Sequence, residues 1–410
     1  MKTSLLITAA CLLAILSTIG ASLPYPILPP LFAADASNNL NHFLGLPPKL
    51  LFGIALSINP LGLLIGSGLL GPLSDRYGRR PILLGSAIGA AIGHAITAWA
   101  LIAQSYPLFI FARFVTGLLE GNSSVARAML ADRLTGDLRV QALAWLNGAF
   151  YAGWLAGPLL AGITLIWGIT VPFWTAVVAL LLTAALIAMT LPKEAESHLT
   201  TSWWQVARDK HSLNLVRYPV MRTLFIIQLS YTCGVTAFYE FFPLWLVENG
   251  GYDAQGIAWV TAGLCGLMMV SSIFAGRPNK IEPLKRVRIH AYLAALAIAC
   301  VGIGNIWLGL VAIILFGLPN AFYNALLPSW CSEKFGHHGH GAVMGLISTT
   351  FCLANIIMAL AGAVLTLIDT RVILLLGAAL STWAAWRIGV WKKHLESNVA
   401  TDTQNIMTTN

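Results

Sequence analysis

Six stretches of 25 residues or more in this chain contain no Asp, Glu, Lys or Arg, and each is long enough to cross a lipid bilayer. A transmembrane helix needs about 20 apolar residues, because lipid offers the backbone no hydrogen-bonding partner. The chain is 10% charged, against about 25% in an ordinary soluble domain, so a soluble protein is excluded. The uncharged stretches are Thr3–Ala34, Leu50–Ser74, Pro81–Ala112, Val140–Pro192, Ile289–Ser332 and Phe335–Ile368.

The stretches predict twelve transmembrane helices. Two of them are long enough for two helices and divide at Trp167-Gly168-Ile169-Thr170 and near Gly304-Asn305. Because the segments are uniformly apolar and do not alternate, they favour an all-α integral membrane protein over a β-barrel. The four further spans lie in shorter or interrupted stretches, which are Leu108–Leu130, Thr223–Leu246, Gly256–Ala275 and Val372–Val390.

Lys and Arg are distributed unequally across the predicted membrane. Of 24 such residues, Arg113 lies within a span, Lys49 and Arg371 lie on one side, and the other 21 lie on the opposite side. Cytoplasmic loops are enriched in Lys and Arg, so both termini are predicted to be cytoplasmic in a cell inner (plasma) membrane. The net charge of +8 is spread over several loops, which argues against nucleic-acid binding.

The N-terminal segment permits two interpretations. Lys2 and the apolar stretch from Leu5 to Leu16 resemble a cleavable signal peptide. We favour a retained first helix, because the apolar pattern continues to Phe32 and removal of the segment would leave an odd number of spans.

A charged segment, Lys193–Tyr218, separates six predicted spans from six. Its composition fits a short interfacial helix or a plain linker. The arrangement predicts two pseudo-symmetric six-helix bundles. The predicted domains are residues 1–192 and 220–394, joined by a linker at 193–219 and followed by a flexible cytoplasmic tail at 395–410.

The loop between the second and third spans carries a distinctive motif. Gly78 permits a tight turn, and Asp75 would be stabilised by nearby Arg side chains or by a helix N-terminus. The loop resembles the signature G-x-L-x-D-[RK]-x-G-R-[RK] of the major facilitator superfamily of transporters. The matching residues are Gly71, Leu73, Asp75, Arg76, Gly78, Arg79 and Arg80.

The resemblance implies a gate. Asp75 would dock on the N-terminus of the eleventh helix, near Gly341 and Ala342, and Arg79 would pair with Asp132. These contacts would hold the two halves together on the cytoplasmic side while the cavity faces outward. The corresponding loop of the second half lacks the Asp and the Gly-Arg pair, so we expect a latch in one half only.

The fourth predicted span contains two ionisable residues, Arg113 and Glu120. Such residues are costly at membrane depth and indicate function unless they form a structural pair with a neighbouring helix. Their spacing of seven places them within about 20° of one helix face, about 10 Å apart. Arg113 and Gly117 also match the family pattern R-x-x-x-G, which implies a role in proton coupling, whereas the candidacy of Glu120 depends on burial alone. We expect His94 to be a packed or hydrogen-bonded histidine.

The fifth predicted span reads Gly153-Trp154-Leu155-Ala156-Gly157-Pro158-Leu159-Leu160-Ala161-Gly162. A proline permits a kink, and glycines allow close contact with a helix of the other half. The segment resembles the G-x-x-x-G-P-x-x-G-G signature of antiporters, with Ala161 in place of one glycine. It therefore favours export. The matching residues are Gly153, Gly157, Pro158 and Gly162.

Polar residues inside the spans are candidates for a substrate cavity, although interhelical hydrogen bonding explains the asparagines equally well. Glu240 adjoins them and is a third proton-coupling candidate. Prolines around Tyr25 suggest that the first helix bends beside the same cavity. The cavity candidates are Tyr25, Gln228, Thr232, Tyr239, Asn320, Tyr323 and Asn324.

These patterns predict a secondary active transporter that works by alternating access, with a small-molecule substrate and protons as partners and no cofactor. The resemblance favours proton-coupled efflux of small amphipathic compounds by a monomer, and the alternative is proton-coupled import of a polar metabolite or siderophore. No phosphate-binding loop or catalytic cluster indicates an ATPase or an enzyme. We interpret His337, His338 and His340 as a solvated loop and not as a metal site.

Overall fold

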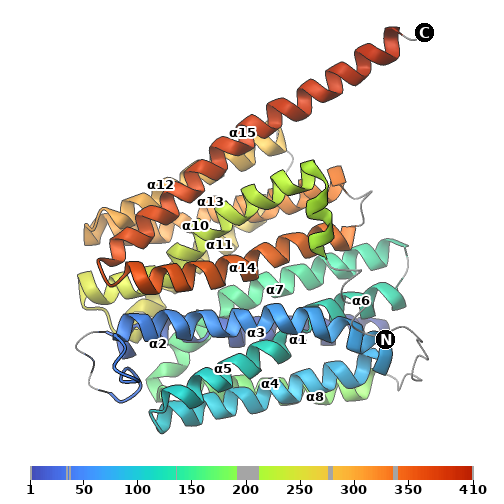
Figure 1. The fold of residues 1–410 in the computed structure, drawn as a ribbon. Coiled ribbons are helices and arrows are strands. Elements are labelled where there is room, and N and C mark those ends of the chain that lie inside the picture. The colour runs from blue at the N-terminus through green and yellow to red at the C-terminus, as the bar shows by residue number, and fades with distance from the viewer. Residues whose placement is uncertain are drawn as a thin grey trace. The chain divides into compact units, whose positions relative to one another are not determined.

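The computed structural model describes residues 2–33, 36, 38–134, 136–191, 212–275, 280–335 and 340–408. Throughout these residues the regular structure is helical (Figure 1). The first half contains α1 (Lys2–Ser22), α2 (Pro24–Leu31), α3 (Pro48–Tyr77), α4 (Arg79–Ile102), α5 (Tyr106–Glu120), α6 (Ser123–Arg133), α7 (Gly136–Thr164), η1 (Leu165–Trp167) and α8 (Val171–Thr190). The second half contains η2 (Ser212–Arg217), α10 (Pro219–Gly250), α11 (Ala254–Ala275), α12 (Pro283–Gly302), α13 (Ile306–Phe335), α14 (His340–Leu365) and α15 (Thr370–Thr408).

Each of the twelve predicted spans is helical over the residues that the structure describes. The first span is divided into α1 and α2 and the fourth into α5 and α6, whereas each of the others is a single helix. Both predicted divisions of the long stretches are confirmed, because Gly168 and Gly304 separate helices there with φ values of +132° and +84°. Among the described segments, eight are long and apolar enough to cross a membrane. The predicted all-α membrane fold is therefore confirmed.

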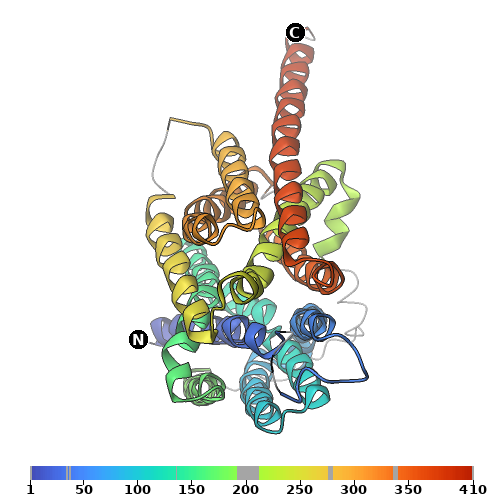
Figure 2. The same ribbon diagram turned by 90° about the vertical axis from the view of Figure 1, so that its left-hand side faces the viewer.

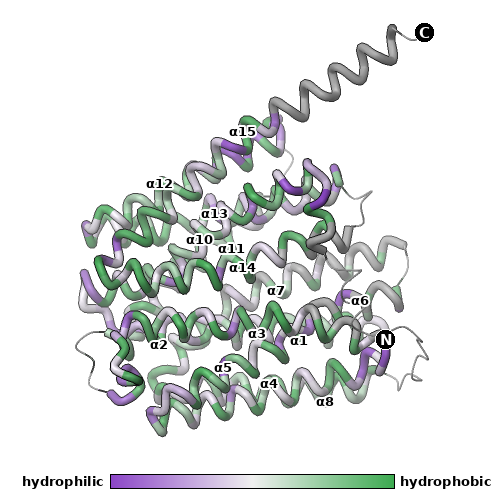
Figure 3. The backbone as a smooth tube through the Cα atoms, in the orientation of Figure 1, coloured by the Kyte–Doolittle hydropathy of each residue, from purple (hydrophilic) through white to green (hydrophobic). Residues whose placement is uncertain are grey.

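The helices carry hydrophobic residues along most of their length and hydrophilic residues mainly at their ends (Figure 3). Large apolar side chains on their surfaces are exposed, among them Leu182 at 67% and Met189 at 84%. Exposed apolar surface on this scale is unfavourable in water but matches the hydrocarbon core of a bilayer. These side chains lie on faces that are suited to contact lipid.

The chain forms two compact units. The first comprises Met1–His211, Pro243–Ala262 and Asn355–Ile368, and the second comprises Ser212–Phe242, Gly263–Ala354 and Asp369–Asn410. Parts of α10, α11 and α14 thus belong to the first unit although they lie in the second half of the sequence. The predicted domain boundaries at residues 192 and 220 stay a prediction.

In the first unit α4 packs against both α5 and α8, while α1 packs against α7 and α3 against α5. Figure 2 shows several helices of this unit nearly end-on and side by side. Gly66 brings α3 close to α5, because a Cβ at this position would overlap the Leu118 carbonyl. A small residue thus allows two membrane helices to approach closely, as the glycine spacing in the sequence suggests.

In the second unit α12 packs against both α13 and α15. Helices α10 and α15 meet at Gly234 and Gly377, where a Cβ on Gly234 would overlap both the Gly377 carbonyl and Ser381 Oγ. Close backbone contact holds this unit together as it does the first.

Candidate functional site

The loop between α3 and α4 turns at Gly78. This glycine has a φ of +92°, which L side chains rarely adopt, so the predicted tight turn is confirmed. Next to it Arg79 donates a hydrogen bond to Ser74 Oγ, and Arg80 Nη2 donates one to the Ala188 carbonyl of α8 at 2.8 Å. These bonds fix the loop to α3 and α8.

The rest of the predicted gate stays a prediction. Helix α14 begins at His340, so Gly341 and Ala342 belong to its first turn. The docking of Asp75 on this turn involves a side chain that the structure does not describe. The same holds for the partner proposed for Arg79. For some gate and histidine-loop residues, the whole residue or its side-chain environment lies outside what the structure describes. These residues are Gly71, Asp75, Asp132, His337, His338 and His340.

Arg113 is buried in α5, with 3% of its surface exposed. Its Nη1 donates a hydrogen bond to the Gly20 carbonyl and its Nη2 donates one to the Ala21 carbonyl, each at 3.1 Å. The backbone carbonyl of Arg113 accepts a hydrogen bond from Asn59 Nδ2 of α3 at 3.2 Å. A planar guanidinium can bind two neighbouring acceptors at once, and Arg113 uses this property to join α5 to α1.

Pro24 explains why the Gly20 carbonyl accepts a hydrogen bond from a side chain. In an α-helix this carbonyl would accept from the backbone N–H of residue 24, but proline has none. Helix α1 accordingly ends at Ser22, and α2 begins at Pro24. The guanidinium of Arg113 replaces the missing donor. The bend expected beside Tyr25 and the hydrogen bond from Arg113 to Gly20 therefore have the same cause, which is Pro24.

Glu120 and Arg113 lie on one face of α5, but their side chains bind partners on different helices. The nearest ionisable partner is His94 of α4, whose Nε2 lies 2.9 Å from Glu120 Oε1. Neither side chain is exposed. His94 is thus a hydrogen-bonded histidine, as expected, but the sequence did not indicate that its partner would be Glu120.

Two atoms of this pair have no hydrogen-bond partner among the described residues, namely His94 Nδ1 and Glu120 Oε2. Gly20 of α1 lies against the pair, because a Cβ there would overlap both His94 Nε2 and Glu120 Oε1. The same glycine accepts a hydrogen bond from Arg113. We call Arg113, Glu120 and His94 the buried charged cluster.

The motif of the fifth span lies in α7 and contacts two helices. A Cβ at Gly153 would overlap Thr18 Oγ1 and one at Gly157 would overlap Ser22 Oγ, so both glycines pack against α1. These two contacts lie within the first half of the sequence, contrary to the expectation of a contact with the other half, because α7 is the direct neighbour of α1. That expectation holds for Gly162, which packs against Ala258 of α11.

Six of the seven cavity candidates lie in the second unit, and hydrogen bonds join them in two groups. In one group Tyr323 donates to Gln228 Oε1 at 3.0 Å, and Gln228 donates to Thr232 Oγ1 at 3.1 Å. In the other, Asn324 donates to Asn320 Oδ1 and Asn320 donates to the Tyr239 hydroxyl, each at 3.1 Å. These bonds connect α10 to α13. We call these six residues the polar network.

Tyr25, the seventh candidate, belongs to the first unit. Its hydroxyl lies 3.5 Å from Asn355 Oδ1 of α14, and its ring centroid lies 5.8 Å from that of Trp154.

A second polar contact of this unit was not anticipated. Lys49 Nζ lies 2.6 Å from Glu248 Oε1 of α10 and donates a hydrogen bond to the Thr366 carbonyl at 2.8 Å.

Glu240 is 1% exposed within α10. Neither of its carboxylate oxygens has a hydrogen-bond partner among the described residues. A buried carboxylate is costly unless it is protonated or binds a cation. Glu240 is therefore chemically suited to accept one or the other.

The sequence and the fold can be compared with those of known proteins. The family description of the Major Facilitator Superfamily matches residues 10–359. The class B tetracycline resistance protein of Escherichia coli is 27% identical over 267 residues, which cover 65% of this chain and 63% of that protein. The class G tetracycline resistance protein of Vibrio anguillarum is 33% identical over 155 residues, which cover 37% and 36% of the two chains. The matches thus span less than two thirds of these relatives.

Solved structures show the same fold. The human organic anion transporter MFSD10 superposes with a TM-score of 0.68 and 19% identity, covering 94% of this chain and 99% of that one. The xylose transporter XylE of E. coli superposes with a TM-score of 0.73 and 15% identity, covering 94% and 96%. The matched residues include the Gly78 turn and the buried charged cluster. The chain therefore belongs to the major facilitator superfamily.

Proposed function

We propose that this transporter exports small amphipathic compounds, and cations in particular, in exchange for protons. Its superfamily consists of transporters, so the chain is a membrane transporter and not an enzyme. In this proposal the protein works as a monomer in the inner (plasma) membrane with both termini in the cytoplasm. The substrate passes between two six-helix bundles that open alternately to either side.

One observation carries this proposal, and it is the excess of acceptor groups inside the spans. Glu120 Oε2 and both oxygens of Glu240 are buried without partners among the described residues. The buried cation Arg113 already donates to two backbone carbonyls. Protons and lipophilic cations would stabilise such carboxylates, whereas an anionic substrate would be repelled.

The relatives support export of drug-like compounds. Several of them are tetracycline resistance proteins, although the matches cover only part of each. A relative described as a putative niacin/nicotinamide transporter of Bacillus subtilis is 29% identical over 201 residues and keeps import as the alternative. Direction and substrate class are therefore the points to test.

The test is the lumenal pH of proteoliposomes that contain the purified protein. The vesicles are loaded with acid and challenged with tetraphenylphosphonium, tetracycline, nicotinamide and a ferric siderophore. We expect the lumen to become more alkaline as tetraphenylphosphonium or tetracycline enters, because protons leave in exchange. Acidification during entry of nicotinamide or the siderophore would instead establish symport and overturn the proposal.

Glu240→Gln is expected to reduce proton-driven export of tetraphenylphosphonium by roughly 10- to 100-fold, because a charge-assisted contact contributes about 1.5–3 kcal/mol. The amide has the shape of the carboxyl group, and no hydrogen bond is lost, so the melting temperature should not fall. Glu333→Gln, at an exposed position of α13, is the matched control and should transport normally. Unchanged export by Glu240→Gln would remove Glu240 from the mechanism.

Tyr323→Phe is expected to lower the free energy of unfolding by about 1 kcal/mol and to raise the apparent KM for tetraphenylphosphonium several-fold. The change removes the hydroxyl that donates to Gln228. Tyr231→Phe is the matched control. The ring centroid of Tyr231 lies 3.5 Å from that of Tyr323 in a stacked arrangement, but the Tyr231 hydroxyl has no hydrogen-bond partner among the described residues. A loss of stability with an unchanged KM would mean that the polar network serves only interhelical packing.

A further inference from the structure

We propose that His94 and Glu120 together form one proton-binding site, and that its protonation state is transmitted to α1 through Gly20 and Arg113. This inference rests on the proposed proton-coupled transport and assigns the proton to particular atoms. His94, which the sequence suggests to be a packed or hydrogen-bonded histidine, becomes part of the coupling machinery.

The geometry leaves room for one additional proton. Nε2 of His94 and Oε1 of Glu120 are 2.9 Å apart, so one proton lies between them in a hydrogen bond. A neutral imidazole has one N–H, and its other nitrogen is an acceptor. With Nε2 as the donor, His94 Nδ1 and Glu120 Oε2 are free to bind a proton, and neither has another partner among the described residues. Buried polar atoms without partners are rare in proteins and often mark a functional site.

The proton balance is simple. When the site opens to water on one side, Nδ1 or Oε2 accepts a proton from hydronium. When it opens on the other side, the same atom returns the proton to water. The hydrogen bond between Nε2 and Oε1 persists in both states, and no bond between heavy atoms changes.

The added proton changes the electrostatic interaction between the pair and Arg113. Arg113 lies on the same helix and interacts electrostatically with Glu120 and with Tyr25 of α2. With neutral His94, the charges of Arg113 and Glu120 cancel, and one added proton gives the buried charged cluster a net charge of +1. All three side chains are buried, so water screens their charges little. The pair itself changes from a net charge of −1 to neutral, so Arg113 loses the attraction of that charge.

The helices packed on α4 add few titratable groups near the pair. Helix α8 contains none and places Phe173 beside His94, with ring centroids 6.3 Å apart. In α1 the titratable residues are Lys2 and Cys11, and Gly20 itself faces the pair. Those of α3 lie at its two ends, and those of α6 are an aspartate and two arginines toward the predicted cytoplasmic side. Arg113 is therefore the principal charge that responds to the added proton.

Gly20 connects this charge to movement. The pair occupies the space that a Cβ of Gly20 would take, and Arg113 binds the Gly20 carbonyl, immediately before the break between α1 and α2. Loss of the attraction between the pair and Arg113 would shift the guanidinium and alter the bonds that Arg113 makes to α1. Protonation would thus bias the position of α1, as a coupled transporter requires.

The test measures protonation in the absence of substrate. Difference infrared spectra of the protein in lipid are recorded at successive pH values, to detect the carboxylic acid C=O band and the imidazole ring bands. We expect a protonation step that is absent in Glu120→Gln and has a different midpoint in His94→Gln. Glutamine at position 94 still donates a hydrogen bond to Glu120 but cannot bind a proton. Glu240→Gln, which alters a carboxyl group of the second unit, should retain the step.

The same step in Glu120→Gln, or an unchanged midpoint in His94→Gln, would overturn the inference. The pH dependence of tetraphenylphosphonium transport gives an independent readout. In both variants, exchange at equal pH should persist within a few-fold, while accumulation driven by a pH gradient should fall at least tenfold. If wild type shows no gradient-driven accumulation, the proposed function fails together with the inference. If wild type and His94→Gln accumulate equally, only the inference fails.

Discussion

Asp75→Asn is expected to abolish transport without reducing the amount of protein in the membrane. Asp75 lies in the loop that resembles the superfamily signature, and this resemblance implies that its carboxylate docks on the first turn of α14, which begins at His340. A negative charge at a helix N-terminus contributes about 0.3–2 kcal/mol, which amounts to as much as about 30-fold in a conformational equilibrium. The amide lacks this charge, so the state in which the cytoplasmic side is closed should become scarce.

Counterflow of tetraphenylphosphonium in proteoliposomes measures this effect. Asp253→Asn is the matched control, because Asp253 is exposed at the start of α11 and accepts a hydrogen bond from the Gly256 N–H at 2.7 Å, which an asparagine oxygen can also accept. The control should transport like wild type. Near-normal flux in Asp75→Asn would remove Asp75 from the gate and leave the loop with a structural role.

The architecture could be predicted because lipid imposes strict rules on a chain. Uncharged stretches of sufficient length must be helical, and Gly168 and Gly304 divide the two longest ones where the sequence suggests. The break between α5 and α6, at Gly121 and Asn122, was not anticipated. No proline marks it, and Gly121 packs against the backbone of α3. Tertiary packing therefore determines a boundary that local sequence does not reveal.

The candidate site was predicted in part. Arg113 and Glu120 are recognisable from the cost of burying charge, but their partners depend on how neighbouring helices are rotated. The bond from Arg113 to Gly20 had a local signal, because Pro24 frees the carbonyl four residues before it. The pairing of His94 with Glu120 had none, since it requires the relative rotation of α4 and α5.

The ion pair of Lys49 and Glu248 lies between a contact with a local sequence signal and a contact with none. Both residues flank spans on the side that has few cations, so an attraction between them was plausible from the sequence. Their direct contact at 2.6 Å follows only from the packing of the first unit, which includes the end of α10. Charge patterning thus indicates which residues can pair, and packing decides which do.

Arg113→Ala is expected to abolish transport and to lower the melting temperature in detergent. Each hydrogen bond from a charged donor contributes about 1.5–3 kcal/mol, and Arg113 makes two to α1. Its removal leaves the Gly20 carbonyl without the donor that Pro24 cannot supply and gives the buried charged cluster a net negative charge. Arg113→Lys keeps the charge but cannot bind both carbonyls with fork geometry, so we expect intermediate stability and little transport.

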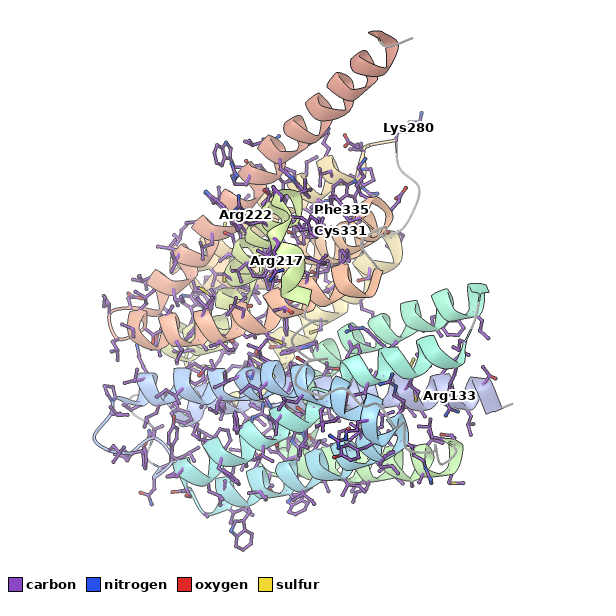
Figure 4. All side chains as sticks on the ribbon, turned by 45° about the vertical axis from the view of Figure 1, so that its right-hand side comes forward. Arg133, Arg217, Arg222, Lys280, Cys331 and Phe335 are labelled. Carbon is purple, nitrogen blue, oxygen red and sulfur yellow. The ribbon has the colours of Figure 1, made fainter. Side chains whose placement is uncertain are left out.

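Arg222→Ala is the matched control, because Arg222 is exposed in the first turns of α10. Figure 4 labels it together with Arg217, Lys280, Cys331 and Phe335 of the second unit and Arg133 of the first. The control should melt and transport like wild type. If Arg113→Ala melts normally but does not transport, Arg113 acts in coupling and contributes little to the fold. If it transports normally, the bonds from Arg113 to α1 cannot carry the proton signal.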